Sequence, residues 1–321
     1  MRREDNLYNE MCSIENITIA AGKACRGKYD QKGVQRFLAN KEENIKILQQ
    51  LLITRRFKTS QYFVFQIQDP KERDIYSLPF YPDRIVHYLL ATHVLEPVIA
   101  KTFTADTYSC IKGKGIHPAA NAVKKALRNE QETQYCLKLD IKKFYPSVDH
   151  YILKALLRRK IKDWRVLSLL NNIIDSAPGL PIGSYLSQYL ANFYLTYFDH
   201  WIKEQKGVKY YFRYADDIVI LSDNKEYLHN LLAEITRYLH EELNLTVKGN
   251  YQVFPVAARG IDFLGYKFYH RYILLRKSIK KNFARKIAQG ANQLTVAAYM
   301  GWAKHCNSKH LVKKLIHQKA A

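Results

Sequence analysis

The feature that most constrains the fold is a pair of apolar, strand-like segments at residues 209–213 and 218–221, separated by a short acidic connection. Two alternating or apolar runs joined by a tight connection predict a β-hairpin. Asp216 and Asp217 occupy the tip of this hairpin. The sequence therefore predicts a sheet that carries carboxylates at the end of its strands.

A third apolar segment, residues 135–140 (YCLKLD), also ends on an acid, Asp140. Single aspartates at turns are usually solvated. Carboxylates that are brought together repel one another unless a divalent cation neutralises them, as in Mg²⁺ sites. Two such ions, about 3.5–4 Å apart, can stabilise the attacking and leaving oxygens of an in-line phosphoryl transfer. Strand-end positions favour this arrangement for Asp140, Asp216 and Asp217.

The chain is strongly basic. Its 321 residues carry 51 Lys+Arg against 29 Asp+Glu, a net charge of +22, and a charge of this size usually indicates a polyanion partner, most often nucleic acid. Thirteen of the basic residues follow Leu264, in a stretch without Asp or Glu. The spacing of Ile279, Phe283 and Ile287 predicts amphipathic helices there. Lysines on such a helical module would neutralise backbone phosphates.

Composition excludes several classes of protein. A hydrophobic fraction of 47% is enough for a sizeable core, which excludes a mainly disordered chain. No apolar run approaches the roughly 18 residues of a membrane span, so we expect no membrane partner. The five cysteines are scattered without zinc spacing, and the N-terminus lacks an apolar secretory signal. We therefore expect a soluble, cytoplasmic protein with free thiols.

Periodicity along the chain predicts an α+β core with a helical front and a basic helical end. The expected helices cover residues 31–55, 83–100, 149–160, 165–175 and the stretch from 183, and the expected front strands cover 61–67 and 75–80.

Five blocks, in order, resemble the conserved blocks of reverse transcriptases. They are residues 137–145 (LKLDIKKFY), 179–188 (GLPIGSYLSQ), 214–217 (YADD), 243–248 (LNLTVK) and 263–266 (FLGY). Two upstream segments, 73–79 and 108–117, resemble the segments that hold the triphosphate. The YADD motif alone would be weak evidence, because a match of four residues recurs by chance. Five blocks that occur in the same order are strong evidence.

The resemblance implies a right-hand polymerase fold with fingers, a palm of antiparallel sheet plus helices, and a short helical thumb. It divides the chain into residues 1–134 (N-terminal helical extension and fingers), 135–262 (palm, with finger insertion elements) and 263–321 (primer-grip hairpin and basic thumb). It also implies an RNA-directed DNA polymerase, a nucleotidyltransferase that uses template RNA, a DNA primer and deoxynucleoside triphosphates.

For the metal site, the resemblance implies that Asp140, Asp216 and Asp217 are catalytic and hold two Mg²⁺ ions, which Mn²⁺ can replace. The backbone carbonyl of Ile141 would add a ligand.

The resemblance assigns the incoming nucleotide to eight residues: Arg73, Lys112, Lys114, Tyr145, Ile182, Gly183, Gln188 and Lys248. Tyr145 would block a 2′-hydroxyl, although either Phe144 or Tyr145 could instead be a core residue. Lys248 would donate a proton to the leaving pyrophosphate, and the alternative is an ordinary surface lysine. Primer and template contacts are assigned to Tyr214, Phe263, Leu264, Gly265, Tyr266, Lys280 and Lys281.

One departure points to a subfamily. Most reverse transcriptases have Gln where this chain has Ile182, and residues 182–188 resemble the IGxxxSQ pattern of diversity-generating retroelement enzymes. That resemblance implies mutagenic retrohoming in a bacterium or its phage. Template-repeat RNA is copied into cDNA with errors at adenines, with the help of a small basic oligomeric accessory protein. An apolar side chain offers no amide hydrogen bonds at this position, which provides a physical reason for low fidelity.

Three alternatives stay open. The chain could be another bacterial reverse transcriptase of the group II intron, retron or antiviral type, although the Val-Thr-Gly signature of retron enzymes is absent from the sequence. It could be an inactive RNA-binding protein on a polymerase scaffold, against which the retained aspartates speak. A transcription regulator is disfavoured because no helix-turn-helix or zinc motif is present.

Overall fold

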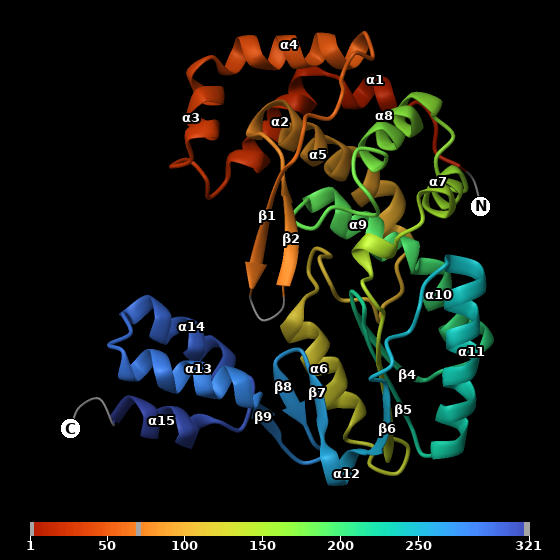
Figure 1. Cartoon of the computed structure of the whole chain (residues 1–321), viewed down its shortest axis with the longest axis vertical. Coiled ribbons are helices and arrows are strands. Elements are labelled where there is room, and N and C mark those ends of the chain that lie inside the picture. Colours follow the sequence, from red (N-terminus) through yellow and green to blue (C-terminus); the bar gives the residue numbers. More distant parts are fainter. Residues whose placement is uncertain (1–2, 69–71, 318–321) are drawn as a thin grey trace. The chain divides into compact units, whose positions relative to one another are not determined.

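The computed structural model describes residues 3–68 and 72–317 (Figure 1). The chain forms two compact units. The first unit consists of Met1–Thr104, Lys142–His200 and Tyr238–Leu245; the second consists of Ala105–Ile141, Trp201–Arg237 and Thr246–Ala321. Helices and strands occur in both, so the chain has the mixed α and β composition that the sequence predicts.

The first unit is mainly helical. Its α-helices are α1 (Leu7–Met11), α2 (Ile14–Cys25), α3 (Lys32–Ala39), α4 (Lys41–Ile53), α5 (Ile85–Leu90), α7 (His150–Arg158), α8 (Trp164–Ile174), α9 (Tyr185–Tyr194) and α10 (Thr196–His200). Its π-helical segments are η1 (Phe80–Arg84) and η2 (Ala91–Ile99), and its 3-10 helices are η3 (Ala100–Thr102) and η4 (Tyr145–Ser147). An antiparallel hairpin, β1 (Phe63–Gln68) and β2 (Glu72–Ser77), completes it.

The helix expected over residues 31–55 is two helices, α3 and α4, that meet at Asn40. Asn40 has a non-helical backbone (φ −131°, ψ 45°). The Asn44 side chain donates to the Phe37 carbonyl, which belongs to the last turn of α3. Periodicity predicted helix on both sides of Asn40 but not the break, because the hydrophobic spacing continues through it.

The second unit is built on a four-stranded antiparallel sheet of order β4-β5-β3-β6. Its strands are β3 (Tyr135–Asp140), β4 (Tyr210–Tyr214), β5 (Asp217–Ser222) and β6 (Gln252–Pro255), and a second sheet contains β7 (Ile261–Phe263), β8 (Tyr266–Phe268) and β9 (Ile273–Leu275). The helices and turns of this part of the chain are α6 (Ile116–Ala126), η5 (Trp201–Gln205), α11 (Lys225–Leu243), of which residues 238–243 belong to the first unit, and α12 (Val256–Arg259). The predicted strand at 135–140 and the predicted hairpin are both confirmed.

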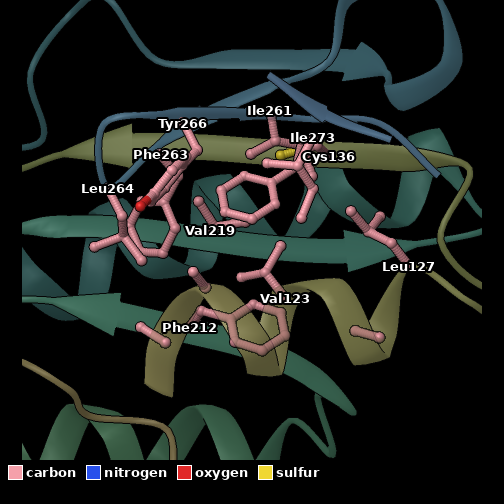
Figure 2. Close-up of a cluster of buried hydrophobic side chains, with 14 of the residues drawn as sticks. Val123, Leu127, Cys136, Phe212, Val219, Ile261, Phe263, Leu264, Tyr266 and Ile273 are labelled. Carbon is pink, nitrogen blue, oxygen red and sulfur yellow. The ribbon is translucent and has the colours of Figure 1, made fainter. Parts of the chain in front are cut away.

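One face of the β4-β5-β3-β6 sheet carries the main core of this unit. The register pairs Phe212 with Val219 on β4 and β5, and Cys136 with Phe254 on β3 and β6. Directly opposed residues point to the same face, and these four are buried. Figure 2 shows the labelled side chains of this cluster between helix α6, which contributes Val123, and the β7–β9 sheet. Because side chains alternate between the two faces of a strand, Asp140 on β3 and Asp217 on β5 lie on the same face as this core.

The basic C-terminal stretch folds as three helices, α13 (Lys277–Ala288), α14 (Gln293–Ala303) and α15 (Lys309–His317), which confirms the predicted helical tail. We call these three helices the tail module. Phe283 and Ile287 of α13 are buried with Ala303 of α14 and Val312 of α15. The Phe283 and Tyr299 rings stack with centroids 4.6 Å apart. Lys319, one of the thirteen basic residues of this stretch, lies outside the described residues.

Within the residues that the structure describes, no helix is both long and apolar enough to cross a bilayer. All five cysteines are free thiols.

Candidate active site

The candidate site lies in the second unit, at the end of strands β3 and β5. The register of these strands places Asp140 directly opposite Asp217. Like charges that face each other across neighbouring strands destabilise a sheet. The local sequence thus builds a repulsive pair at the very end of a well-packed core, which indicates that the pair serves something other than stability.

Asp216 lies beside this pair because of an unusual turn. Strands β4 and β5 are joined by Ala215 and Asp216 alone, and Ala215 has a left-handed backbone with φ 54°. This conformation costs a non-glycine residue about 1–2 kcal/mol. The buried Arg213 side chain donates to the Ala215 carbonyl at 3.0 Å and supports the turn. Backbone strain of this kind concentrates at functional sites.

Burial and mutual repulsion perturb the titration of these acids. Burial, followed by the hydrogen bond and negative charge of Asp140, raises the pKa of Asp216 to about 7. Burial likewise raises the pKa of Asp217 to about 6, although the ammonium of Lys138, 3.6 Å from Asp217 Oδ1, opposes the rise. Both groups therefore keep their protons to a higher pH than an ordinary carboxyl does, and a nearby cation would favour their ionised forms.

Two of the carboxylate oxygens have no hydrogen-bond donor. Oδ1 of Asp140 and Oδ1 of Asp217 are buried, and neither accepts a hydrogen bond from any residue that the structure describes. Buried acceptors are almost always satisfied. In the described part of the chain no three acidic, imidazole or thiol side chains are arranged so that they could hold a metal ion together. The orphaned oxygens nevertheless fit a divalent cation, which takes oxygen ligands.

Lys248 lies at the same end of the sheet. Its backbone N–H donates to the Asp140 carbonyl at 2.8 Å, and its Nζ lies 3.7 Å from Asp140 Oδ2. Ile141 is buried and forms an isolated bridge with Val247, which precedes Lys248. The structure thus brings Lys248, more than a hundred positions away in the sequence, to Asp140 and its neighbour Ile141.

Sequence reasoning missed Lys138 and Arg276. Lys138 lies two residues before Asp140 on β3 and therefore faces the same side; it contacts Asp217 and donates to the Asp262 carbonyl. Arg276 pairs with the Asp262 carboxylate at 2.5 Å, and its positive charge also lowers the pKa of Asp217. The period-two alternation of residues 135–140 could have identified Lys138. Arg276 carries no such signal because its contacts arise from the packing of another sheet.

Several residues assigned to the nucleotide belong to the first unit. Arg73 is exposed on β2. The Tyr76 N–H donates to the Ile182 carbonyl at 3.0 Å, so the turn containing Ile182 and Gly183 packs on β2. Gly183 has φ 109°, and a Cβ there would lie 3.2 Å from the Ile75 side chain. Gln188 lies half-buried on α9.

Tyr145 is also tied to this block. The Leu180 N–H donates to the Tyr145 carbonyl at 2.8 Å. A Cβ at Gly179 would lie 2.5 Å from the same carbonyl oxygen, so this approach requires glycine. Phe144 is buried, whereas Tyr145 is half-buried. Of the two aromatic residues that the sequence left open, Phe144 is therefore the core residue.

The two loop lysines of the second unit differ. Lys112 is exposed. Lys114 donates to the Ala105 carbonyl at 2.9 Å and lies 5.6 Å from the centroid of the Tyr108 ring. Lys112 is thus available to a phosphate, while Lys114 also holds the loop together.

The segment assigned to the primer is a tight hairpin. Leu264 (φ 54°) and Gly265 (φ 83°) form a turn with two left-handed residues, the geometry that suits the twist of a hairpin. The side chains of Phe263 and Tyr266 are buried, and the Tyr266 hydroxyl donates to the Trp302 carbonyl. These two residues can position the hairpin, but their side chains are not available to nucleic acid.

The remaining assigned residues lie at two places in the same unit. Tyr214 is half-buried and directly opposite Asp217 in the register. Lys280 and Lys281 are exposed on α13.

Comparison with known families settles what kind of chain this is. The sequence model described as reverse transcriptase (RNA-dependent DNA polymerase) matches residues 69–268, which is more than half of the chain. The chain belongs to the reverse transcriptase family. The matched segment contains β3, the β4–β5 hairpin and all three aspartates.

Relatives in this family are distant. The chain is 26% identical over 257 residues to the retron Ec73 reverse transcriptase of Escherichia coli, covering 72% of this chain and 78% of that protein. It is 24% identical over 235 residues to protein YkfC of Escherichia coli K12, covering 59% and 61%. It is 28% identical over 167 residues to a 91 kDa protein in the cob intron of Schizosaccharomyces pombe, covering 48% and 20%. The chain thus spans about three fifths of YkfC and one fifth of the yeast protein.

Proposed function

We propose that this protein is an RNA-directed DNA polymerase that extends a DNA primer on an RNA template with deoxynucleoside triphosphates. The observation that carries the proposal is the end of strands β3 and β5, where Asp140 and Asp217 face each other and Asp216 lies in the adjoining turn. Membership of the reverse transcriptase family supports the substrate class. Within this proposal the two units supply fingers, palm and a tail module that acts as the thumb, in a cytoplasmic enzyme.

The chain's own residues divide the work. Asp140, Asp216 and Asp217 would hold two Mg²⁺ ions, or Mn²⁺ in their place, with the Ile141 carbonyl as a further ligand. When bound, the ions stabilise the charge of the attacking and leaving oxygens. Lys248, whose Nζ lies 3.7 Å from Asp140 Oδ2, would give its proton to the leaving pyrophosphate.

Residues of the first unit and the exposed lysines would position the substrates. Arg73 and Lys112 are exposed cations suited to the triphosphate. Tyr145, half-buried and fixed through its carbonyl, would exclude a 2′-hydroxyl. Lys280 and Lys281 on α13 would neutralise phosphates of the template–primer duplex.

Primer extension tests the proposal. The full chain should extend a DNA primer annealed to RNA when Mg²⁺ or Mn²⁺ is present and should stop when the ions are chelated. Adding terminally blocked nucleotides would show that extension follows the template. Failure to extend a primer on any RNA, including the RNA encoded beside the gene and with its neighbouring small protein added, would contradict the proposal.

We further propose that the enzyme is of the diversity-generating retroelement type. Ile182, in place of the glutamine that is usual in the family, supports this subtype, together with the residues that follow it to Gln188. In this proposal the template is a repeat RNA, the cDNA carries errors at adenines, and a small basic oligomeric protein assists. The retron Ec73 relative, which aligns with 72% of this chain, favours a retron-type enzyme as the second candidate.

Replacing Ile182 with glutamine separates the two. Because Ile182 is only half-buried and its turn is held to β2 by its backbone carbonyl, the Ile182→Gln variant should fold. We expect its errors at template adenines to fall by about tenfold, since an amide restores polar contacts worth about 1 kcal/mol or more. Sequencing the cDNA measures this. Errors spread evenly over the four bases in the unmodified enzyme would contradict the subtype.

A further inference from the structure

A cavity in the first unit has no part in the proposed polymerase chemistry. It encloses about 540 Å³, within the range of small-molecule sites. Helices α1, α4 and α8 supply six of its nine lining residues. Seven of the nine precede residue 69, where the match to the reverse transcriptase family begins. The cavity is therefore largely built by a part of the chain that the family match does not cover.

An arginine occupies a glycine position at the rim of this cavity. Helix α4 ends in a Schellman motif, in which the Arg56 N–H donates to the Leu51 carbonyl and the Arg55 N–H to the Leu52 carbonyl, both at 2.8 Å. The residue after the helix cap must then be left-handed and is usually glycine. Here it is Arg55, with φ 57°. Glycine would adopt this left-handed conformation with less strain, so an arginine at this position indicates a role for its side chain.

That side chain lies over an exposed aromatic ring. The Arg55 guanidinium is 5.0 Å from the centroid of the Trp164 ring, and Trp164 is 58% exposed. Tryptophan is a large apolar side chain that normally finds cover. Arg55 forms no ion pair with a carboxylate among the described residues, and both side chains line the cavity. The Arg55 guanidinium and the Trp164 ring thus form a cation–π pair that lines the cavity.

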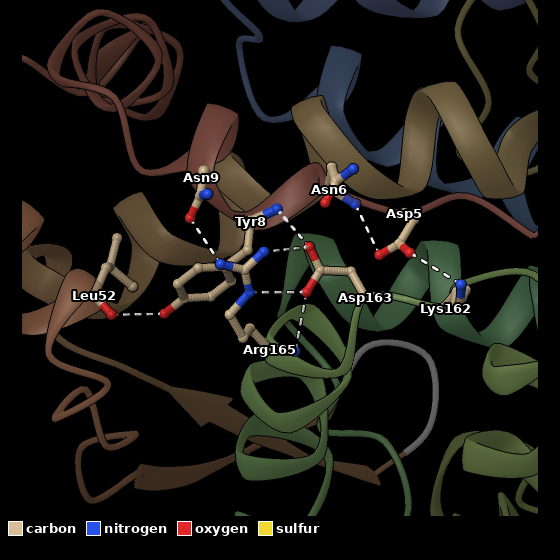
Figure 3. A network of polar contacts seen from close by, with 8 residues as sticks. All are labelled: Asp5, Asn6, Tyr8, Asn9, Leu52, Lys162, Asp163 and Arg165. Atoms are coloured by element: carbon tan, nitrogen blue, oxygen red, sulfur yellow. Dashed lines mark hydrogen bonds and ion pairs between the residues drawn. The ribbon is translucent and has the colours of Figure 1, made fainter.

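A second arginine of the lining, Arg165, already has its charge neutralised by Asp163. Asp163 is buried and accepts hydrogen bonds from the Tyr8 N–H at 2.9 Å and the Arg165 N–H at 3.0 Å (Figure 3). Hydrogen bonds from Tyr8 and Arg165 overcome the effect of burial and hold the pKa of Asp163 below its ordinary value. Arg165 also donates to Asn9. Because Asp163 neutralises Arg165, Arg55 gives the cavity its net positive charge.

The remaining lining suits a polar planar ligand. Asn9 Oδ1 accepts from Arg165, Ser13 Oγ accepts from a backbone N–H of α2, and Gln49 Nε2 donates to a backbone carbonyl. The Asn9 amide nitrogen, the Ser13 hydroxyl proton and the Gln49 amide oxygen are the groups that a ligand could use, and none of the nine lining residues is acidic. Ser13 caps the N-terminus of α2 and Trp164 begins α8, so the positive ends of two helix dipoles border the cavity. A stacking surface, a cation and hydrogen-bonding groups are what single-stranded nucleic acid sites combine.

We propose that this cavity binds one nucleotide of single-stranded RNA, outside the polymerase centre. Its base would stack on Trp164, and its phosphate would pair with Arg55. The polar side chains at the back of the cavity would contact the base edge. The same chemistry would accept a free nucleoside monophosphate, so the experiment compares the two sources. This site would hold template RNA whether or not the chain polymerises DNA, and the proposal therefore stands apart from the proposed function.

The test follows the fluorescence of Trp164 in the full chain. The difference between the unmodified protein and Trp164→Phe isolates the emission of Trp164 from that of the other two tryptophans. Oligoadenylate RNA and 5′-AMP are titrated separately, at a salt concentration high enough to weaken the general attraction of the +22 charge. We expect RNA to quench Trp164, and an RNA carrying photoreactive bases to crosslink to it.

Arg55→Gly and Arg56→Ala form a matched pair. Both remove one exposed arginine at the end of α4, but only Arg55 stacks on Trp164. Glycine suits the left-handed position, so Arg55→Gly should keep or raise the melting temperature. It should nevertheless weaken RNA quenching by about tenfold, while Arg56→Ala changes it little. Primer extension on a short primed template should be unchanged in both.

The outcomes are distinct. Quenching by RNA but not by 5′-AMP supports the proposal with RNA as the source, and equal binding of 5′-AMP supports it with free nucleotide as the source. Absence of quenching by either ligand, as expected for a cavity that takes a protein segment, overturns it. Equal RNA quenching in Arg55→Gly and Arg56→Ala also overturns it.

Discussion

Two groups of aspartates in this molecule have opposite surroundings. Asp163 of the first unit accepts hydrogen bonds from Tyr8 and from Arg165, and its pKa is lowered. Asp140 and Asp217 of the second unit each keep a buried oxygen without a donor, and burial raises the pKa of Asp217 to about 6. The residue type is the same, but Asp163 is buried whereas the side chains of Asp140 and Asp217 are 30% and 31% exposed. The two groups therefore differ in exposure and in what surrounds the carboxylate.

The contrast separates structural from functional carboxylates. A carboxylate whose oxygens are all satisfied contributes to stability and has nothing left to offer a ligand. A carboxylate with an orphaned, buried oxygen costs stability in the free protein and is ready for a cation. Such a cost is expected at a site kept for chemistry, because selection for stability alone would remove it.

The largest expected effect is on activity. Asp216→Asn keeps the shape of the side chain but removes a ligand charge, and we expect primer extension to fall by at least about a thousandfold. RNA binding, measured by filter retention, should stay within about twofold because the affinity comes from exposed cations. Asp163→Asn serves as the control for loss of one buried aspartate. Near-normal extension by Asp216→Asn would contradict the assignment of the site.

Removal of the satisfied carboxylate should instead cost stability. Asp163→Ala leaves Arg165 and the Tyr8 N–H without their acceptor and removes the cap of α8. We expect the free energy of unfolding to fall by about 3 kcal/mol. Urea denaturation followed by circular dichroism measures this. A loss below about 1 kcal/mol would show that the network is not structural.

The two groups should also respond to pH with opposite signs. The lowered pKa of Asp163 contributes stability that is present at neutral pH and is lost as the pH falls through its folded pKa. The raised pKa of Asp216, about 7, means that its ionisation costs stability as the pH rises from the unfolded value through about 7. Without divalent ions, Asp216→Asn should therefore melt higher than the unmodified protein at pH 8 and equally at pH 4. Mg²⁺ should reduce this difference; equal melting at both pH values would refute the sign.

The smallest expected effect comes from exposed charge. Changing both Lys280 and Lys281 to glutamate should weaken binding of a template–primer duplex by about tenfold and reduce the slope of affinity against salt by about 2. The same change at Lys124 and Lys125, exposed on α6, is the charge-matched control. Fluorescence anisotropy over a range of salt concentrations measures both. Equal effects of the two pairs on affinity would show that only the total charge matters. Neither change should alter the pKa values of the three aspartates.

Much of the second unit could be predicted from the sequence because its signals are local. Apolar alternation predicted the strand at 135–140, and two such runs around a short connection predicted the hairpin of Asp216 and Asp217. What alternation cannot provide is the pairing of strands far apart in the chain. The register that sets Asp140 opposite Asp217 joins residues more than seventy positions apart.

The same limit explains why the sequence did not identify some residues around the aspartates. Lys138 shares a face with Asp140 and could have been found from spacing, whereas Arg276 and the Asp163 network depend on contacts between distant segments. The resemblance assigned Phe263 and Tyr266 to the primer, and the structure shows that both side chains are buried. A family motif identifies positions that matter but does not tell whether a side chain acts directly or holds its neighbours in place.

The hairpin turn at Gly265 has a consequence for exchanging parts between relatives. A Cβ at Gly265 would lie 2.5 Å from the Trp302 ring, and Tyr266 donates to the Trp302 carbonyl. The match to the reverse transcriptase family ends at residue 268, yet the packing of this hairpin continues to α14. A chimera joined at residue 268 would therefore pair a hairpin with a foreign helix. A functional junction should lie before residue 261, so that the hairpin and the tail module come from the same parent.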